Sequence, residues 1–235
     1  MLCQCVACSA FLRKEESFFC DLCTSLLNSA QLGALCPHCL EPQTRCLGHS
    51  SQTSPTFKTL LAGFELHPRI EPGFRFWKTH AAHALLQELL KKAALLIHQI
   101  PKEIDGVIPV PHSAVRKTQL AGGSSERLAQ ALALKLQCPY LPHALLPAKH
   151  AQSIAALSLF ERQKELQEHR FRYNTRVPIK GQSFLLVDDF LTSGLTLQSA
   201  AQTLKSLKSK PEIHGFVLAA RWMKWDRTPE SATKH

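Results

Sequence analysis

The sequence predicts an α/β fold, in which a parallel sheet flanked by helices follows a small cysteine-rich module. Eight of the nine cysteines lie within the first 50 residues of the 235-residue chain. Beyond them, short apolar runs typical of buried parallel strands alternate with segments whose apolar residues recur with a helical period. Because strands that alternate with helices form parallel sheets, this second part is predicted to be one α/β domain. With 45% hydrophobic and 20% charged residues, the chain can bury one sizeable core.

The cysteine-rich module spans residues 1–49, and its cysteines form pairs with the spacing of zinc knuckles. Its candidate ligands are Cys5, Cys8, Cys20, Cys23, Cys36, Cys39, Cys46 and His49. Each pair brings two ligands close enough to share one tetrahedral zinc ion, and a second pair completes the site. Because so short a segment has few large apolar groups, metal binding would supply its folding energy. We therefore expect structural zinc, either two ions or one with the remaining thiols free, and the sequence leaves the pairing of knuckles open.

Composition sets the boundaries that follow this module. Residues 50–56 are polar and include a proline, which is typical of a linker. The α/β domain is then predicted to span residues 57–225. The polar residues 226–235 are expected to form a flexible tail.

Large aromatic side chains are concentrated near the start of this domain, at Phe64, Phe74, Phe76 and Trp77. Together with neighbouring basic residues they could form a stacking platform for single-stranded nucleic acid. Burial in the core is the other interpretation, and it is the one we favour.

Periodicity predicts the order of the next elements. Residues 79–100 have apolar side chains at helical spacing, and the apolar run within 104–111 predicts a strand. A second helix is expected over residues 124–136, with Ser124 as its cap. A buried strand is expected over residues 213–220.

The domain is organised around an apolar run that ends in Asp188 and Asp189. A turn with hydroxyl side chains and Gly194 follows, and it leads into a helix that begins near Leu195. In open α/β sheets, ligands bind at the carboxyl ends of strands, and a helix N-terminus beside a glycine suits a phosphate group. We expect the turn to hold phosphate. Because neighbouring residues of a strand point to opposite faces, the two carboxylates are expected to divide the labour rather than share one proton.

This stretch resembles the 5-phosphoribosyl-1-pyrophosphate (PRPP) signature of type I phosphoribosyltransferases. The matching positions are Val187, Asp188, Asp189, Thr192, Ser193, Gly194, Leu195 and Thr196. Together with the cysteine-rich module, they make the whole chain similar to the ComF/GntX family of competence-associated, phosphoribosyltransferase-like proteins. The resemblance implies a type I phosphoribosyltransferase-like sheet. It also implies that the carboxylate pair holds the ribose hydroxyls, that the turn holds the 5′-phosphate, and that Mg²⁺ accompanies PRPP.

Two further segments are similar to this family. The predicted strand at 104–111 continues into a basic loop, in which Arg116 and Lys117 are suited to a pyrophosphate leaving group. After this point the family usually has Arg-Gly-Phe-Asn-Gln, and this chain has a different sequence. Downstream, Gln152 and Arg162 match a segment that lies over the active site of the family as a hood, so they are expected to contact substrate. An ordinary amphipathic helix is the alternative for this segment.

Charge and the resemblance together leave two functions open. Lys and Arg outnumber Asp and Glu by 28 to 18, and the formal charge of +10 favours polyanionic partners. No apolar stretch reaches the roughly 18 residues that span a bilayer, and the expected location is the cytoplasm. The first function is Mg²⁺-assisted transfer of phosphoribosyl from PRPP to an unknown acceptor, with Asp188, Asp189, Arg116 and Lys117 as catalytic residues. The alternative is a non-enzymatic factor that binds single-stranded DNA during DNA uptake.

Overall fold

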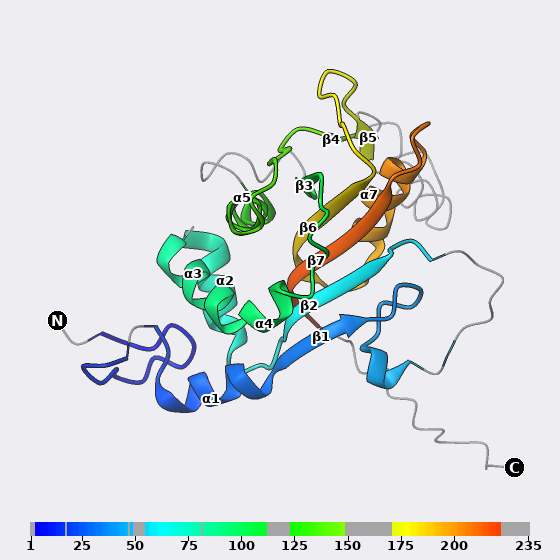
Figure 1. Cartoon of the computed structure of the whole chain (residues 1–235). Helices are drawn as coiled ribbons and strands as arrows, with labels where there is room; N and C mark the ends of the chain where they lie inside the picture. The colour runs from blue at the N-terminus through cyan, green and yellow to red at the C-terminus, as the bar shows by residue number, and fades with distance from the viewer. Residues whose placement is uncertain are drawn as a thin grey trace, which may run out of the picture.

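A five-stranded sheet forms the centre of the computed structural model, with strand order β1-β2-β7-β6-β3 (Figure 1). The described residues are 3–16, 18–46, 48, 55–80, 82–111, 123–148 and 171–221. The strands of this sheet are β1 (Gln31–Leu35), β2 (Thr59–Glu65), β3 (Gly106–Pro109), β6 (Ser183–Leu191) and β7 (Glu212–Ala220). β2, β7, β6 and β3 are parallel, whereas β1 pairs antiparallel with β2 at one edge. The predicted α/β class with a mainly parallel sheet is confirmed.

Helices cover both faces of this sheet (Figure 1). The helices are α1 (Asp21–Ser29), α2 (Glu71–His80), α3 (His83–Lys92), α4 (Ala94–Ile97), α5 (Ser124–Leu136) and α7 (Leu195–Lys205), with a 3-10 turn η1 (Gln43–Arg45). α2 to α5 lie on one face. α7 lies on the other, together with a small antiparallel ribbon of β4 (Leu145–Pro147) and β5 (Phe171–Tyr173). None of the helices in these described ranges is long and apolar enough to cross a membrane.

Side chains of β6 alternate between the two faces and build a core on each. Leu185 and Val187 pack with the helices α2 to α5, whereas Phe184 and Leu186 pack with α7. This period of two is the property of a strand, and burial of both faces explains why the run is apolar throughout. The sheet is thereby held rigidly up to the point where the carboxylates begin.

The N-terminal segment is packed into the same sheet. β1 extends it through the register Gly33 to Ala62 and Leu35 to Leu60. Side chains that surround the first cysteines share one core with those of the α/β part; they include Phe19, Leu27, Phe64 and Trp77. The cysteine-rich segment therefore takes part of its stability from the sheet.

The aromatic residues near the start of the α/β part are mainly core. Phe64, Phe74 and Trp77 are fully buried, and the rings of Phe64 and Phe74 lie 5.5 Å apart. Phe76 is 38% exposed and stacks on His80 at 4.2 Å. The favoured interpretation, burial, is confirmed for the first three, so a platform of all four rings is wrong.

The helix predicted over residues 79–100 is divided in the structure. α2 ends at His80, α3 covers His83–Lys92, and the short α4 follows. The apolar period continues across these breaks, which is why it does not reveal them. The break after His80 matters, because it ends α2 just beyond Lys78, a residue of the site described below.

Candidate functional site

The central stretch forms a strand, a turn and a helix, in the predicted order. β6 includes Asp188 and Asp189, as expected, and continues beyond them to Leu191. The turn follows, and α7 begins at Leu195. β3 pairs with β6 in parallel, with Pro109 opposite Val187, so both strands end at the same edge of the sheet. This edge is where open α/β sheets bind ligands.

The turn has the properties of an anion site. Gly194 adopts φ +74° immediately before α7, a conformation that favours glycine. Thr192 and Ser193 are exposed, and Thr196 is half-buried. The first turn of a helix directs backbone N–H groups and the positive end of its dipole outward. A phosphate placed at this turn would meet N–H and hydroxyl donors.

Both carboxylates beside the turn are buried. Asp188 is 7% exposed and Asp189 is 3% exposed. Oδ2 of Asp189 accepts the hydroxyl of Ser124 and lies 2.6 Å from Nζ of Lys78. Oδ1 of Asp189 accepts the N–H of Phe190 at 2.7 Å, and Oδ1 of Asp188 accepts the N–H of Asp189 at 2.8 Å. A buried carboxylate is tolerated when such donors replace water.

The two carboxyl groups also interact with each other. Burial raises the pKa of Asp188 well above its usual value, and the neighbouring charge of Asp189 raises it further. The N–H of Asp189 and the ammonium of Lys78 oppose this rise only in part. Asp189 faces the ammonium of Lys78, whereas burial and the charge of Asp189 work against ionisation of Asp188. The two carboxyl groups thus have different surroundings, and the expected division of labour between them stays a prediction.

Two residues of this site come from elements that sequence reasoning did not connect with it. Lys78 is on α2, with its side chain 28% exposed, and Nζ lies 4.7 Å from the ring centre of Phe190. Ser124 is the first residue of α5, and it is not the helix cap that the sequence predicted. Instead the N–H of Gly123 donates to the side chain of Glu126, which leaves the Ser124 hydroxyl for Asp189. Lys78 was considered only as a basic neighbour of the aromatic residues, because it lies on an amphipathic helix remote in sequence from Asp189.

Arg127 adds a further positive group behind the carboxylates. One of its terminal nitrogens donates to the backbone carbonyl of Lys78 at 3.3 Å. Burial lowers its pKa, and the charges of Asp189 and Glu126 oppose that shift. The carboxylate pair is thus surrounded by donors and cations from α2 and α5.

Several predicted site residues lie outside the described part of the chain. They are His49, Arg116, Lys117, Gln152 and Arg162. The described chain is continuous from β3 to Pro111, at the edge where β6 ends, and resumes at Gly123.

The carboxylate pair does not offer a ready-made Mg²⁺ site. Mg²⁺ requires oxygen ligands in near-octahedral geometry. Both oxygens of Asp189 already accept donors, and burial raises the pKa of Asp188, which works against its ionised form. The described oxygens therefore suit hydrogen-bond donors better than direct coordination of a cation.

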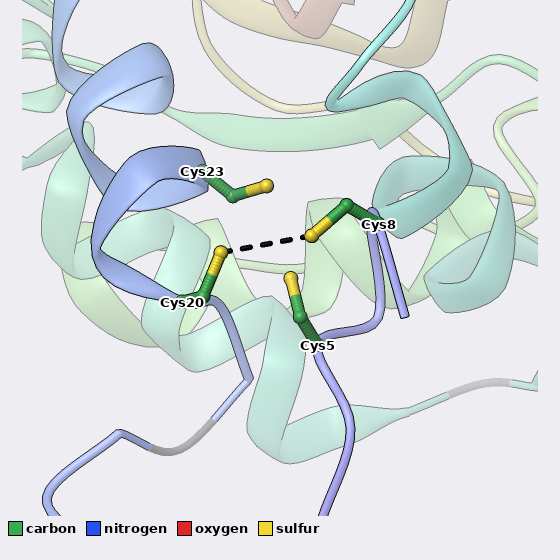
Figure 2. Close-up of side chains that lie close together, drawn as sticks. All are labelled: Cys5, Cys8, Cys20 and Cys23. Atoms are coloured by element: carbon green, nitrogen blue, oxygen red, sulfur yellow. Dashed lines mark hydrogen bonds between the residues drawn. The ribbon is translucent and has the colours of Figure 1, made fainter. Parts of the chain in front are cut away.

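The cysteines gather into two clusters, the first of which is drawn in Figure 2. The sulfur atoms of the first cluster lie within 4.8 Å of one another and belong to Cys5, Cys8, Cys20 and Cys23. The second cluster contains Cys36, Cys39 and Cys46, whose sulfur atoms also lie within 4.8 Å of one another. Within them, Cys8 and Cys20 are 3.6 Å apart, and Cys39 and Cys46 are 3.9 Å apart. Zinc–sulfur bonds of about 2.3 Å in a tetrahedron place sulfurs about 3.8 Å apart, so both clusters could hold zinc.

The clusters decide the pairing that the sequence left open. The first two knuckles pair with each other, and the third pairs with Cys46 of the fourth. Cys3 and Cys138 belong to neither cluster. The described residues thus supply four thiols to the first site and three to the second.

One thiol in each cluster is poised to ionise. Burial raises the pKa of Cys5, but hydrogen bonds with the backbone of Cys20, Ala7 and Cys8 outweigh it and lower the value to about 7. The pKa of Cys36 is lowered to about 7 in the same way. Burial and neighbouring thiols raise the pKa of Cys39 to about 11. The thiolate is the form that binds metal. A thiol with a lowered pKa that lies beside other thiols is therefore typical of a set of metal ligands.

Comparison with known proteins places this geometry in context. The sequence profile described as "Phosphoribosyl transferase domain" matches residues 80–233. "Competence protein F" of Haemophilus influenzae is 24% identical over 214 residues, which cover 87% of this chain and 91% of that protein. "DNA utilization protein YhgH" of Escherichia coli K12 is 24% identical over 196 residues, 79% of this chain and 83% of its own. The protein of the same name from Salmonella typhimurium is 24% identical over 212 residues, which cover 85% of this chain and 89% of that protein.

The pairing of knuckles is tested by metal analysis of variants. We expect two zinc ions per chain, and one ion fewer in either Cys20→Ser or Cys46→Ser, because each removes a ligand of a different cluster. Inductively coupled plasma mass spectrometry on purified protein measures the content. Cys138→Ser is the control and should keep both ions. Two ions in Cys46→Ser would show that the second cluster is not a metal site.

The ion pair at Asp189 is tested by Lys78→Met, which keeps the apolar stem but removes the ammonium. Loss of the cation leaves a buried charge less compensated, so the free energy of unfolding at pH 7 should fall by about 2 kcal/mol. That estimate is below the value for a fully buried pair because Lys78 is 28% exposed.

The pH dependence of this loss follows from linkage. Without Lys78 the carboxylate pair binds a proton more tightly in the folded state, so the loss should shrink as the pH falls and the pair is neutralised. Urea unfolding at pH 7 and pH 5 measures both values. Lys58→Met removes an exposed ion pair with Glu212 and should cost less than about 1 kcal/mol. A loss in Lys78→Met that is no larger than in this control would contradict the role of the buried pair.

Proposed function

Because this chain belongs to the phosphoribosyl transferase domain family and, with its cysteine-rich N-terminus, to the ComF/GntX family, we propose that it binds a phosphorylated ribose of the PRPP class. The site is the turn 192–196 with Asp188 and Asp189. The observation that carries this proposal is the positive φ of Gly194 between the buried acidic end of β6 and the first turn of α7. Such a turn brings backbone donors and carboxylates to one sugar phosphate.

Binding of the phosphate uses the turn itself. The 5′-phosphate accepts from backbone N–H groups at the start of α7 and from the hydroxyls of Thr192, Ser193 and Thr196. Val187 and Leu195 hold the ends of this segment in the strand and the helix. The dipole of α7, an 11-residue helix, favours the negative charge at this position.

Binding of the ribose uses the acidic pair by exchange of donors. Ribose hydroxyls donate to Asp188 and Asp189, in place of the contacts that Asp189 has with Ser124 and Lys78. The ammonium of Lys78, once released, lies near the bound anion. Exchange of the Ser124 hydroxyl for a ribose hydroxyl has a small net cost. Separation of Lys78 from Asp189 costs more, about 2 kcal/mol, and attraction of the ammonium to the bound anion offsets that cost.

The catalytic part of the proposal is transfer of phosphoribosyl to an acceptor. Arg116 and Lys117 follow β3 in sequence and neutralise the pyrophosphate leaving group, while Gln152 and Arg162 close over the substrate. The negative charge of the acidic pair stabilises an oxocarbenium-like centre at the sugar as the bond to pyrophosphate breaks. Mg²⁺ carried by the pyrophosphate oxygens would supply further charge neutralisation.

A second candidate function is binding of single-stranded DNA during DNA uptake, without catalysis. Relatives named for competence and for DNA utilization favour it. A formal charge of +10 supports attraction to a polyanion. Of the aromatic residues considered for stacking, Phe76 is the exposed one. The cytoplasm stays the predicted location under both functions.

The sugar-phosphate proposal is tested by titration calorimetry with PRPP and Mg²⁺. We expect binding that needs Mg²⁺ and that is lost in Asp189→Asn, because the amide removes the charge and one acceptor of the ribose hydroxyls. Glu212→Gln, at the opposite end of the parallel strands, is the matched control and should bind as the unmodified protein does. No heat at millimolar PRPP would overturn the proposal.

The DNA alternative is tested by the salt dependence of binding. Affinity for a fluorescent single-stranded oligonucleotide should fall steeply between about 50 and 200 mM salt, because neutralised phosphates release counterions. Fluorescence anisotropy measures the slope, and a phosphate-free peptide nucleic acid of the same sequence is the control ligand. A flat response would rule this function out.

A further inference from the structure

We propose that Leu40 is a positioning residue for the phosphate turn and that a metal ion at Cys36, Cys39 and Cys46 holds it in place. The second cysteine cluster would thereby set the geometry of residues 192–196. The effect on ligand affinity rests on the proposed function. The mechanical coupling is a property of the ligand-free fold and can be measured by itself.

Leu40 packs directly against the turn. It is 6% exposed and shares an apolar cluster with Leu191 and Leu197, which stand on either side of the turn. A methyl group on Gly194 would overlap the terminal carbon Cδ1 of Leu40. The absence of a side chain at Gly194 therefore serves two needs, its positive φ and the close approach of Leu40 to its backbone.

The knuckle holds Leu40 in an unusual conformation. Its φ of +64° is in the left-handed region, which residues other than glycine seldom adopt. Two backbone hydrogen bonds close the loop around it: the N–H of Leu40 donates to Cys36 at 2.9 Å, and the N–H of Cys36 donates to Glu41 at 2.7 Å. Leu40 follows Cys39 directly, so a metal that joins Cys36, Cys39 and Cys46 fixes the backbone from which Leu40 projects.

The first cluster touches a different part of the protein. Phe19 and Val6, which lie next to its cysteines, pack against Gly73 of α2 on the opposite face of the sheet. Metal loss there should leave the turn between β6 and α7 unaffected. Cys20→Ser is therefore a matched control for a substitution in the second cluster.

Hydrogen exchange of the ligand-free protein tests the coupling. The reporter is the N–H of Gln198, which donates to the carbonyl of Gly194 at 2.9 Å. Leu40→Ala and Cys39→Ser should each raise its exchange rate about tenfold, whereas Leu40→Met and Cys20→Ser should leave it near the original value. Leu40→Ala and Cys39→Ser both act through the contact of Leu40 with the turn. In the double variant, the N–H of Gln198 should therefore exchange no faster than in Cys39→Ser alone.

Two results would overturn the proposal. One is unchanged exchange at Gln198 in Cys39→Ser protein that has lost one metal ion by mass spectrometry. The other is faster exchange in Leu40→Ala that extends equally to the amides of β7, which would make Leu40 an ordinary core residue. Retention of both metal ions in Leu40→Ala together with a local effect supports the proposal.

Ligand affinity gives a second readout. If the unmodified protein binds PRPP, the dissociation constant should rise about tenfold in Leu40→Ala and be restored in Leu40→Met, because a misplaced turn loses aligned donors. Unchanged PRPP affinity in Leu40→Ala would count against the positioning role. If the unmodified protein binds no PRPP, the proposed function fails, and the exchange result by itself decides the coupling.

Discussion

The buried ion pair between Lys78 and Asp189 determines how the helices meet the sheet at this site. A carboxylate inside a strand loses the water that would solvate it, and it is stable only when a cation and hydrogen-bond donors replace that water. Here the cation comes from α2 and a hydroxyl donor comes from Ser124 at the start of α5. Glu126 takes over the capping contact, so that Ser124 is available for this purpose. α2, α5 and β6 therefore converge where the phosphate turn begins.

The cysteine-rich segment is built into the same arrangement by packing. β1 extends the sheet next to β2, and each cysteine cluster places an apolar side chain against a glycine. Phe19 beside the first cluster contacts Gly73 in α2, and Leu40 beside the second contacts Gly194 at the turn. Two glycines thus allow the N-terminal segment to approach the backbone of two elements that form the site. The contact of Leu40 is made at the phosphate turn itself, whereas that of Phe19 is made at α2 on the other face of the sheet.

Recognition of a sugar phosphate would use a site that already satisfies its buried groups. The acidic pair carries donors from the protein, and ribose hydroxyls are donors of the same kind. Thr192 and Ser193 of the turn are exposed to solvent, whereas the acidic pair beside the turn is almost fully buried. This contrast explains how one short segment can attract a phosphate at its exposed end and select a sugar at its buried end.

The sequence by itself determined the α/β class, the strand that contains Asp188 and Asp189, and the turn at Gly194. It determined these because strand and helix periods and the demands of a tight turn are local properties of the chain. Only the tertiary structure decided which knuckles pair, that Phe64, Phe74 and Trp77 are core whereas Phe76 is exposed, and that Lys78 and Ser124 reach Asp189. Ser124 and Asp189 are 65 residues apart, and no local pattern encodes a contact that arises when two helices pack on one strand. The raised pKa of Asp188 has the same origin, because burial and the nearby charge of Asp189 result from the packing around β6.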